Sequence, residues 1–244
     1  MRKKKVGIIG YGKWAKKVIP IINKICKIHF ISNTKNSYKL QDHNVDWVFV
    51  LSNNESHYKI VKYFLSKKIN VFCEKPLTES LTQSKKLIDY SNKKKTRLFI
   101  SEVELFKNKK IPKSRRFKIK REKFEKIKKF SSPIIYRLAY HDFYLLFETL
   151  KREIIRKISY KNQKKQISIK INTDKTEYNF NYNLNIKKQS HFINNINFNN
   201  FSGNPFKKMI KNVLSNKVNF KSNNTRAIFC NYLISKIKRY ETSF

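Results

Sequence analysis

Three small residues near the N-terminus have a spacing that can hold a phosphate group. Gly10, Gly12 and Ala15 form the pattern G-x-G-x-x-A between an apolar run, 6–10, and a segment with helical spacing. The glycines permit a tight turn and close approach to a pyrophosphate, and the helix start offers N–H groups to the anion. Because only four glycines occur and three lie at positions 7, 10 and 12, the pattern favours a dinucleotide site over a merely structural turn.

The polar residues after the second apolar run bear on which dinucleotide would bind. An acid that binds the ribose hydroxyls commonly lies about 20 residues after the glycines. Here no acid occurs from residue 29 up to Asp42. The residues at that place could instead bind a 2′-phosphate: Ser32, Asn33, Thr34 and Lys35. The sequence therefore favours NADP over NAD; the alternative is that these are ordinary loop residues and that either cofactor binds.

A strand that ends on an acid, a base and a proline is the second chemical feature. The apolar run 69–73 is followed by Glu74, Lys75 and Pro76. A proline alone would explain the end of the strand, so that interpretation does not require the charged pair. Ligands of a doubly wound sheet lie at the carboxyl ends of its strands. We therefore expect this pair at the edge that holds the phosphate turn.

A histidine in the second half is the third feature. His141 and Asp142 precede an apolar run with helical spacing. Histidine suits general acid and base catalysis because its ordinary pKa is near neutrality. The alternative is a buried histidine that caps a helix, with Asp142 as a favourable charge at the helix start.

The elements that must position these residues form two patterns. In the first hundred residues, expected strands alternate with expected helices: strands at 6–10, 28–31, 47–51, 70–73 and 97–102, and helices at 13–27, 57–67 and 80–93. Such alternation predicts a parallel α/β sheet of the Rossmann type. Residues 107–129 are basic, with little expected core, whereas 154–201 alternate apolar and polar residues with a period of two. Two helices are expected at 205–214 and 225–240.

The predicted fold class is therefore a Rossmann-type parallel-sheet domain followed by an α+β domain with a mostly antiparallel sheet. We place the NAD(P)-binding domain at 1–106 and a trimmed domain for substrate and oligomerisation at 107–244. One face of the second sheet is expected to be solvated.

The order of motifs resembles the Gfo/Idh/MocA family of NAD(P)-dependent oxidoreductases. Residues 45–80 read VDWVFVLSNNESHYKIVKYFLSKKINVFCEKPLTES. Like that family, they run from an acid through an apolar strand, a short polar turn and a histidine on a helix to a strand that ends in E-K-P. The phosphate turn matches too, and the segment 99–106 looks like the next strand of the family. The resemblance covers about residues 5–106.

The resemblance implies roles for the triplet at the end of the fourth strand. Lys75 would lie near the nicotinamide and the reacting carbon, and would polarise or protonate the substrate oxygen. Burial or a neighbouring cation must then lower the pKa of the lysine from its ordinary value near 10.4. Glu74 would bind the ribose or hold the lysine, and Pro76 would follow a cis or tightly fixed peptide bond.

The implied cofactor-binding residues are Gly10, Tyr11, Gly12, Lys13, Trp14, Ala15, Ser32, Asn33, Thr34, Lys35, Leu51, Ser52, Asn53, Asn54, His57, Glu74, Lys75 and Pro76. The implied catalytic residues are Lys75 and His141, because the family carries a later signature close to D-x-x-x-H-D. The implied substrate-binding residues are Lys75, Glu102, Arg137, His141 and Asp142. Arg137 is a departure, since many members carry there an acid that orients the histidine. An arginine would instead depress the pKa of the histidine or bind an anionic substrate group.

The charge of the chain has two interpretations. Lys and Arg number 56 against 16 Asp and Glu, which gives a formal net charge of +40. Lysine recurs in every region together with Asn and Ile, which favours biased composition over a specific nucleic-acid site. Either way, the surface should attract anionic ligands.

Other functional classes receive less support. No apolar run reaches the roughly 18 residues of a membrane span, and no secretory signal is evident. We therefore predict a cytoplasmic protein without membrane contact. Three widely separated cysteines predict buried free thiols and no metal site.

The resemblance implies a hydride transfer between a nicotinamide cofactor and a sugar-like substrate, and the basic surface and Arg137 favour one that is phosphorylated or nucleotide-linked. The first alternative is a dinucleotide-binding protein that has lost turnover, and the second is a polyanion- or RNA-binding module. We also expect a homo-oligomer, formed through the C-terminal sheet.

Overall fold

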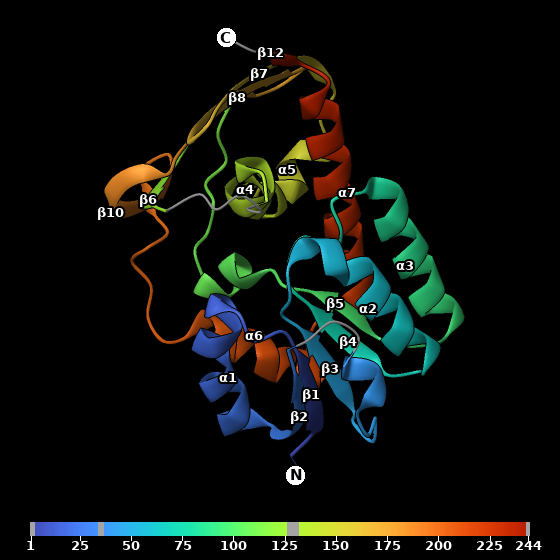
Figure 1. Cartoon of the computed structure of the whole chain (residues 1–244). Coiled ribbons are helices and arrows are strands. Elements are labelled where there is room, and N and C mark those ends of the chain that lie inside the picture. Colours follow the sequence, from blue (N-terminus) through green and yellow to red (C-terminus); the bar gives the residue numbers. More distant parts are fainter. Residues whose placement is uncertain (1–2, 34–36, 126–131, 243–244) are drawn as a thin grey trace. The chain divides into compact units, whose positions relative to one another are not determined.

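The computed structural model describes residues 3–33, 37–125 and 132–242 (Figure 1). Contacts divide the chain into two compact units: residues 1–103 with 204–228, and residues 104–203 with 229–244. The predicted division into functional domains at residues 106 and 107 stays a prediction, because compactness alone does not define a functional domain.

The first unit contains a five-stranded parallel sheet with the strand order β2-β1-β3-β4-β5. Its strands are β1 (Lys5–Ile9), β2 (Lys27–Ser32), β3 (Trp47–Val50), β4 (Asn70–Cys73) and β5 (Leu98–Ile100). The central strand β3 and its neighbour β4 are almost wholly apolar, as both faces of such a sheet are covered by helices. This arrangement confirms the predicted Rossmann-type sheet.

Helices of the first unit are α1 (Lys13–Ile25), α2 (Asn54–Ser66), α3 (Leu81–Lys93) and α6 (Pro205–Leu214), with a 3-10 turn η1 (Ser37–Leu40) after β2. Helices α2 and α3 pack together, and α1 packs against α6 (Figure 1). The bounds of α6 are as the sequence predicts, and the side chain of Asn204 caps its first turn. Helix α7 (Phe220–Lys238) begins in this unit.

Two side chains of α7 explain why a C-terminal segment belongs to the first unit. Asn223 accepts a hydrogen bond from the N–H of Ile100 and donates one to its carbonyl, each at 2.8 Å. The amide thus takes the place of a further strand at the edge of β5, where backbone groups would otherwise stay unsatisfied. Arg226 binds both oxygens of Glu102, at 2.7 and 2.6 Å.

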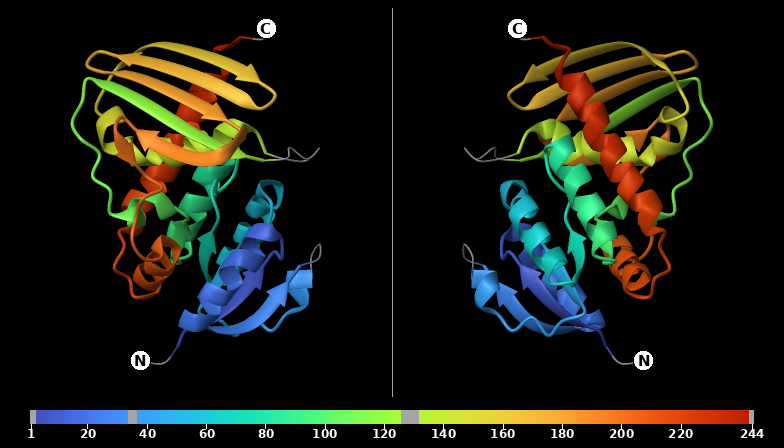
Figure 2. Two further views of the ribbon diagram at one scale, coloured as in Figure 1. Left: turned by 90° about the vertical axis from the view of Figure 1, so that its left-hand side faces the viewer. Right: turned by 90° about the vertical axis from the view of Figure 1, so that its right-hand side faces the viewer.

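The second unit contains a seven-stranded sheet with the order β11-β10-β6-β9-β8-β7-β12 (Figure 2). Its strands are β6 (Arg116–Phe124), β7 (Ile155–Gln163), β8 (Gln166–Thr173), β9 (Glu177–Asn183), β10 (Asn185–Ile193), β11 (Ile196–Asn197) and β12 (Glu241–Thr242). Only the pairs β6–β9 and β7–β12 are parallel, which confirms a mostly antiparallel sheet.

Strand β6 corrects the expectation of little core in 107–129. It lies between β10 and β9, and its residues Phe117 and Ile119 are buried. The pattern of alternating apolar and basic residues was present, but the lysines concealed it because they also dominate the loops. Residues 126–129 lie outside the described chain.

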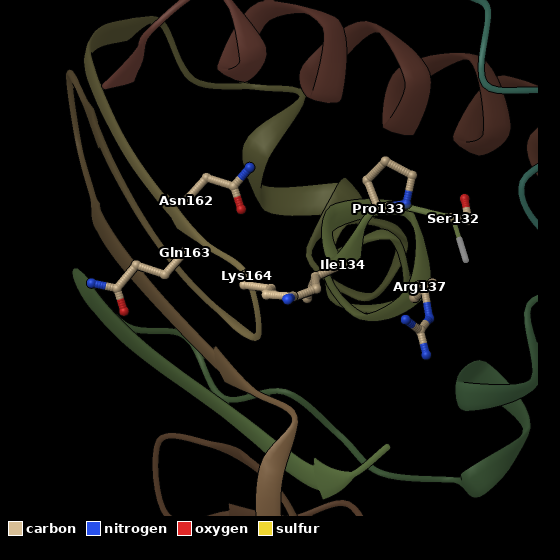
Figure 3. A pocket seen from close by; sticks show the side chains of 7 residues that line it. All are labelled: Ser132, Pro133, Ile134, Arg137, Asn162, Gln163 and Lys164. Carbon is tan, nitrogen blue, oxygen red and sulfur yellow. The ribbon is translucent and has the colours of Figure 1, made fainter. Parts of the chain in front are cut away.

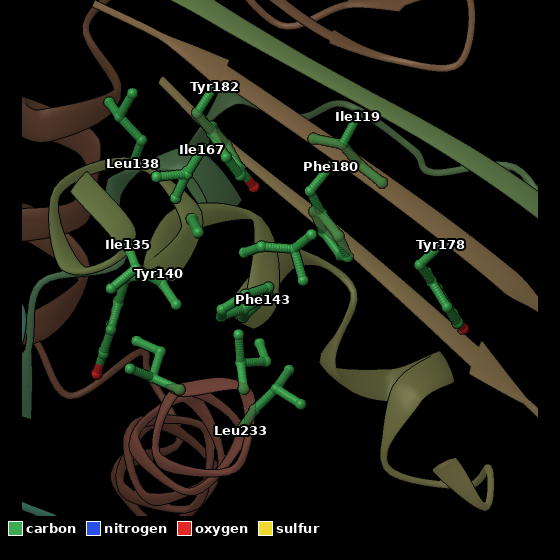
Figure 4. Close-up of a cluster of buried hydrophobic side chains, with 14 of the residues drawn as sticks. Ile119, Ile135, Leu138, Tyr140, Phe143, Ile167, Tyr178, Phe180, Tyr182 and Leu233 are labelled. Atoms are coloured by element: carbon green, nitrogen blue, oxygen red, sulfur yellow. The ribbon is translucent and has the colours of Figure 1, made fainter. Parts of the chain in front are cut away.

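The core of the second unit lies between the inner face of this sheet and several helical segments: a π-helical turn η3 (Ile135–Ala139), α4 (Tyr140–Leu145), α5 (Phe147–Leu150) and the end of α7. A short 3-10 turn η2 (Val103–Lys107) follows β5. Phe143 of α4 meets Phe180 of β9 edge to face, with 5.2 Å between ring centroids. Figure 4 shows Phe143 between the strand that carries Phe180 and the helix that carries Leu233.

The outer face of the same sheet is polar, as predicted. Lys118, Asn179, Lys170 and Ser159 lie in register across four adjacent strands, and none is buried. An association of subunits through this face stays a prediction.

The described residues also bear on two sequence-based expectations, those about membrane spans and about cysteines. No helix in 3–33, 37–125 or 132–242 is both long and apolar enough to cross a membrane. Cys26, Cys73 and Cys230 are buried free thiols, as predicted.

Candidate functional site

The phosphate turn follows β1, and its first glycine has a conformation that other residues rarely adopt. Gly10 has φ = +106°, and a Cβ there would lie 2.7 Å from the amide nitrogen of Ser52 and 2.8 Å from the carbonyl oxygen of Leu51. Its N–H donates to the carbonyl of Ser32 at 2.8 Å. The turn is therefore packed between the ends of β2 and β3, and a side chain at Gly10 would displace it.

The second glycine leaves open space at the start of α1. Gly12 is the N-cap residue, and a Cβ there would meet nothing within 4 Å. No side chain caps the helix and its first turn holds no acid, so its N–H groups can receive an anion. Ala15 is buried, whereas Tyr11, Lys13 and Trp14 are exposed. These features fit the pyrophosphate of a dinucleotide.

The E-K-P triplet follows β4, and the Lys75–Pro76 peptide bond is cis. Burial raises the pKa of the Glu74 carboxyl, although the hydrogen bond from Trp14 and the charge of Lys75 act in the opposite direction. The Oε1 atom of Glu74 is buried and has no hydrogen-bond partner among the described residues. An acceptor of this kind fits a donor such as a ribose hydroxyl, so this residue also suits a dinucleotide.

His57 connects the turn after β3 to the triplet. Its Nδ1 lies 2.9 Å from the carbonyl oxygen of Pro76, and its Nε2 lies 3.1 Å from that of Ser52. Burial lowers the pKa of His57 because it outweighs these two contacts. The predicted contact of His57 with the cofactor stays a prediction, and it would require the ring to leave one of these carbonyls.

The other predicted cofactor residues lie in two places. Ser52 contacts Ser56 through the hydroxyl groups at 2.7 Å, Asn53 is the N-cap of α2, and Asn54 donates to Glu79 at 2.9 Å. Leu51 is buried at the end of β3.

At the end of β2, the hydroxyl of Ser32 contacts that of Ser37, and Asn33 is exposed. Thr34 and Lys35 lie outside the described residues.

His141, in the second unit, is held from one side by a tyrosine. Its Nδ1 lies 2.9 Å from the hydroxyl of Tyr144, and that hydroxyl accepts a hydrogen bond from the N–H of Glu104 at 3.1 Å. The ring of His141 is partly exposed, whereas Tyr144 is buried. The histidine is therefore both oriented and accessible.

Asp142 points into the second unit instead. It is fully buried, and its two oxygens contact His191 Nε2 at 2.7 Å and the hydroxyl of Tyr182 at 3.0 Å. Burial alone would raise the pKa of Asp142, but the contact with His191 and the charge of Arg121 hold it below its ordinary value. A contact of Asp142 with substrate, which stays a prediction, would have to replace one of these bonds.

Glu104 is the centre of a buried network that sequence reasoning missed. Its carboxylate lies 2.7 Å from Lys107 Nζ and 3.0 Å from Arg121, with His191 Nδ1 at 3.7 Å. Burial would raise the pKa of Glu104, but the charges of Arg121, His191 and Lys107 keep it low. The available signal was the placement of Arg121 and His191 in strands, at positions where a large polar side chain is unusual.

The remaining two predicted substrate residues already have charged partners. Glu102 is bound by Arg226, as described above. Arg137 forms an ion pair with Glu125, which also binds Lys123 at 2.8 Å. Their contacts with substrate stay predictions.

A small open pocket of about 250 Å³ lies beside Arg137. It is lined by Ser132, Pro133, Ile134, Arg137, Asn162, Gln163 and Lys164. Figure 3 shows that these side chains come from the start of the helical segment and from the β7–β8 hairpin. In the described part of the chain, no cluster of three or more His, Cys, Asp or Glu residues could hold a metal ion.

The sheet order, the glycine turn and the strand end with Glu74 and Lys75 define the first unit as a Rossmann-type dinucleotide-binding unit. Residues 23–102 match the model of an oxidoreductase family with an NAD-binding Rossmann fold, the Gfo/Idh/MocA family. The resemblance deduced from the motifs is thereby confirmed over residues 23–102.

Solved structures show the same fold over nearly the whole chain. The UDP-N-acetylglucosamine 3-dehydrogenase GnnA from Acidithiobacillus ferrooxidans is 11% identical, with a TM-score of 0.83 over 99% of this chain and 98% of that one. GenD2 from gentamicin A biosynthesis, in complex with NAD, is 11% identical, with a TM-score of 0.78 over 98% and 94% of the two chains. A probable dehydrogenase from Thermotoga maritima is 15% identical, with a TM-score of 0.74 over 97% and 96%. A search of curated proteins gave no significant match.

Proposed function

We propose that this protein is an NAD(P)-dependent oxidoreductase that acts on the hydroxyl or carbonyl carbon of a sugar-like substrate. One observation carries the proposal. The phosphate turn and the E-K-P triplet follow strands of one parallel sheet, and the segment at Ser52 contacts both, through Gly10 on one side and His57 on the other. A purely structural turn would require neither the open space at Gly12 nor the buried acceptor of Glu74.

The residues of the chain divide the work as follows. The N–H groups at the start of α1 would bind the pyrophosphate. The carboxylate of Glu74 would accept a hydrogen bond from a hydroxyl group of the ribose. When bound, the nicotinamide supplies or accepts the hydride. Lys75 donates a proton or a hydrogen bond to the substrate oxygen, and His141 is the second proposed catalytic residue. Lys75 and His141 belong to different units, so their joint action is a prediction that a double variant can test.

The cofactor is proposed to be NADP in preference to NAD. The support is the absence of an acid between residue 29 and Asp42, together with the hydroxyl of Ser32 at the end of β2. Separate titrations with NADPH and NADH check the preference. A tighter complex with NADH would contradict it.

The substrate is proposed to be a phosphorylated or nucleotide-linked sugar. The support is the net charge of +40, which favours anionic ligands, and the substrate in the name of the GnnA structure, UDP-N-acetylglucosamine. A panel of sugars with and without a UDP group tests this class. Equal turnover of free and UDP-linked sugars would contradict it.

The decisive experiment combines binding and turnover. Fluorescence titration should show binding of NAD(P)H, and Lys75→Met should abolish turnover of an accepted sugar while it leaves cofactor affinity within a few fold. Lys85→Met changes an exposed lysine of α3 in the same unit and should alter neither. Absence of NAD(P)H binding would reject the proposed function.

A cofactor-binding protein without turnover is the second candidate. It is favoured by Arg137, which stands where an orienting acid is expected and forms an ion pair with Glu125. Tight NAD(P)H binding, with no turnover across the panel and no effect of Lys75→Met, would establish this alternative.

A further inference from the structure

We propose that Tyr144 is a positioning residue that keeps neutral His141 in the tautomer with the proton on Nε2. This inference deepens the proposed function and rests on it for its chemical consequence. His141 would then act on a substrate oxygen as a hydrogen-bond donor and not as a base.

The direction of the hydrogen bond between Tyr144 and His141 follows from the two atoms. The phenol oxygen already accepts the N–H of Glu104 at 3.1 Å, and it lies 2.9 Å from Nδ1 of His141. A phenol is a good O–H donor, and an imidazole nitrogen is a better acceptor than a phenol oxygen. The tyrosine therefore donates to Nδ1, and a neutral ring must carry its proton on Nε2.

Tyr144 can hold this direction because its surroundings fix it. Residues 141 and 144 are three apart on α4, so their side chains lie on one face of the helix. Tyr144 is buried, and its ring meets His141 edge to face, with 5.7 Å between the centroids. Its acceptor contact is with the backbone of Glu104, whose carboxylate is bound by Lys107 and Arg121. A buried network thus holds the backbone group that orients the tyrosine.

The neighbouring residue anchors the same helix to the sheet. Asp142 binds His191 on β10 and Tyr182 on β9. The helix that carries His141 is therefore held to the sheet, and the ring of His141 cannot turn without breaking the contact with Tyr144.

This arrangement replaces the orienting acid that the resemblance leads one to expect four residues before His141. Arg137 occupies that position and pairs with Glu125. The orienting partner lies three residues after the histidine instead. An acid would accept a proton from Nδ1 and leave Nε2 free to act as a base, whereas a tyrosine that donates to Nδ1 makes Nε2 the donor. The chain's own residues thus assign His141 to polarising the substrate oxygen.

Long-range proton–nitrogen correlation spectra of the imidazole rings test the proposal without cofactor or substrate. The chain has only five histidines, so His141→Gln identifies the His141 signals by their loss. In the native protein, at a pH high enough for the ring to be neutral, we expect a protonated Nε2 and an unprotonated Nδ1. In Tyr144→Phe the ratio of the two tautomers should fall about fivefold, the effect of one hydrogen bond.

Tyr178→Phe is the matched control. Tyr178 is a buried tyrosine of the same unit whose hydroxyl donates to Glu153 at 2.9 Å, so its loss should leave the His141 signals unchanged. A native spectrum with the proton on Nδ1 would overturn the proposal, and so would an unchanged tautomer ratio in folded Tyr144→Phe. If Tyr144→Phe fails to fold, the native spectrum alone decides. If the native tautomer is as proposed but NAD(P)H does not bind, the proposed function fails while the positioning role stands.

Discussion

The two units build their chemistry from different materials. In the first unit, the candidate site is formed mainly by the backbone: a glycine with φ = +106°, an uncapped helix start and a strand end that carries Glu74 and Lys75. In the second unit, His141 depends on buried side chains that come from two strands, a helix and the segment after β5. A site built on backbone needs few residue identities, so it stays recognisable in a lysine-rich chain.

The difference also concerns charge. The first unit leaves one buried carboxylate oxygen, on Glu74, without a hydrogen-bond partner in the described chain, which suits an incoming ligand. The second unit pairs the carboxylates of Asp142 and Glu104 with His191, Arg121 and Lys107, although some buried atoms of this network, among them Glu104 Oε2, make no hydrogen bond within the described chain. We therefore expect changes in the second network to act first on stability, and changes in the first site to act first on cofactor affinity.

The largest expected effect is the loss of stability in Asp142→Ala. The change leaves His191 and Tyr182 without their buried partner and should cost about 3–5 kcal/mol of unfolding free energy. Denaturant unfolding followed by circular dichroism measures it. Asp89→Ala, an exposed acid on α3, should change the unfolding free energy by less than about 0.5 kcal/mol. Equal stability of the two variants would show that the network contributes nothing net.

Gly10→Ala should act on both stability and binding. The strained φ should cost about 1–3 kcal/mol, and the clash with Ser52 should reduce NAD(P)H affinity about tenfold or more. Gly203→Ala is the control, because Gly203 also has a positive φ of 73° but a Cβ there meets nothing within 4 Å. It should lose some stability and no affinity. Unchanged affinity in Gly10→Ala would separate this turn from the cofactor.

These two variants mark what the sequence could and could not reveal. The glycine turn, the E-K-P triplet and the alternation of strands and helices are local patterns, and they predicted the parallel sheet and the place of Glu74 and Lys75. The partners of Asp142 lie 40 and 49 residues away along the chain. No local pattern connects Asp142 with Tyr182 or His191, because only the order of β6, β9 and β10 brings them together. The same reason hid Asn223 at the edge of β5.

Acid should destabilise the two units at different pH values. The pKa values of Asp142 and Glu104 are lowered, so their contribution to stability is present above about pH 4 and is lost as the pH falls through the lowered values. The pKa of Glu74 is raised, so its contribution is present below about pH 4 and is lost as the pH rises through the raised value. Between about pH 5 and about pH 3 the second unit should therefore weaken first.

Hydrogen exchange measured by mass spectrometry can follow this separation. Peptides from β9 and β6 should lose protection in acid before peptides from β3 and β4. Tryptophan fluorescence adds a second probe of the first unit, because both tryptophans, Trp14 and Trp47, belong to it. Loss of protection at the same pH in both units would show that these carboxylates do not govern the acid response.

The smallest expected effect concerns the contact between Trp14 and Glu74. Trp14 is 39% exposed and its hydrogen bond lowers the pKa of Glu74, whereas Trp47 is only 2% exposed in β3. In Trp14→Phe the carboxylate loses a donor, so its pKa should rise further and NAD(P)H affinity should fall about fivefold, the effect of one hydrogen bond. The fall should be greater at lower pH, because a larger fraction of Glu74 is then protonated and no longer accepts a hydrogen bond from a ribose hydroxyl through a charged oxygen.

Titrations of NAD(P)H at two pH values measure this fall in affinity, with Trp47→Phe as the control for the loss of an indole. An affinity that does not depend on pH in Trp14→Phe would mean that Glu74 does not contact the cofactor, and the case for a ligand site in the first unit would then rest on the glycine turn alone.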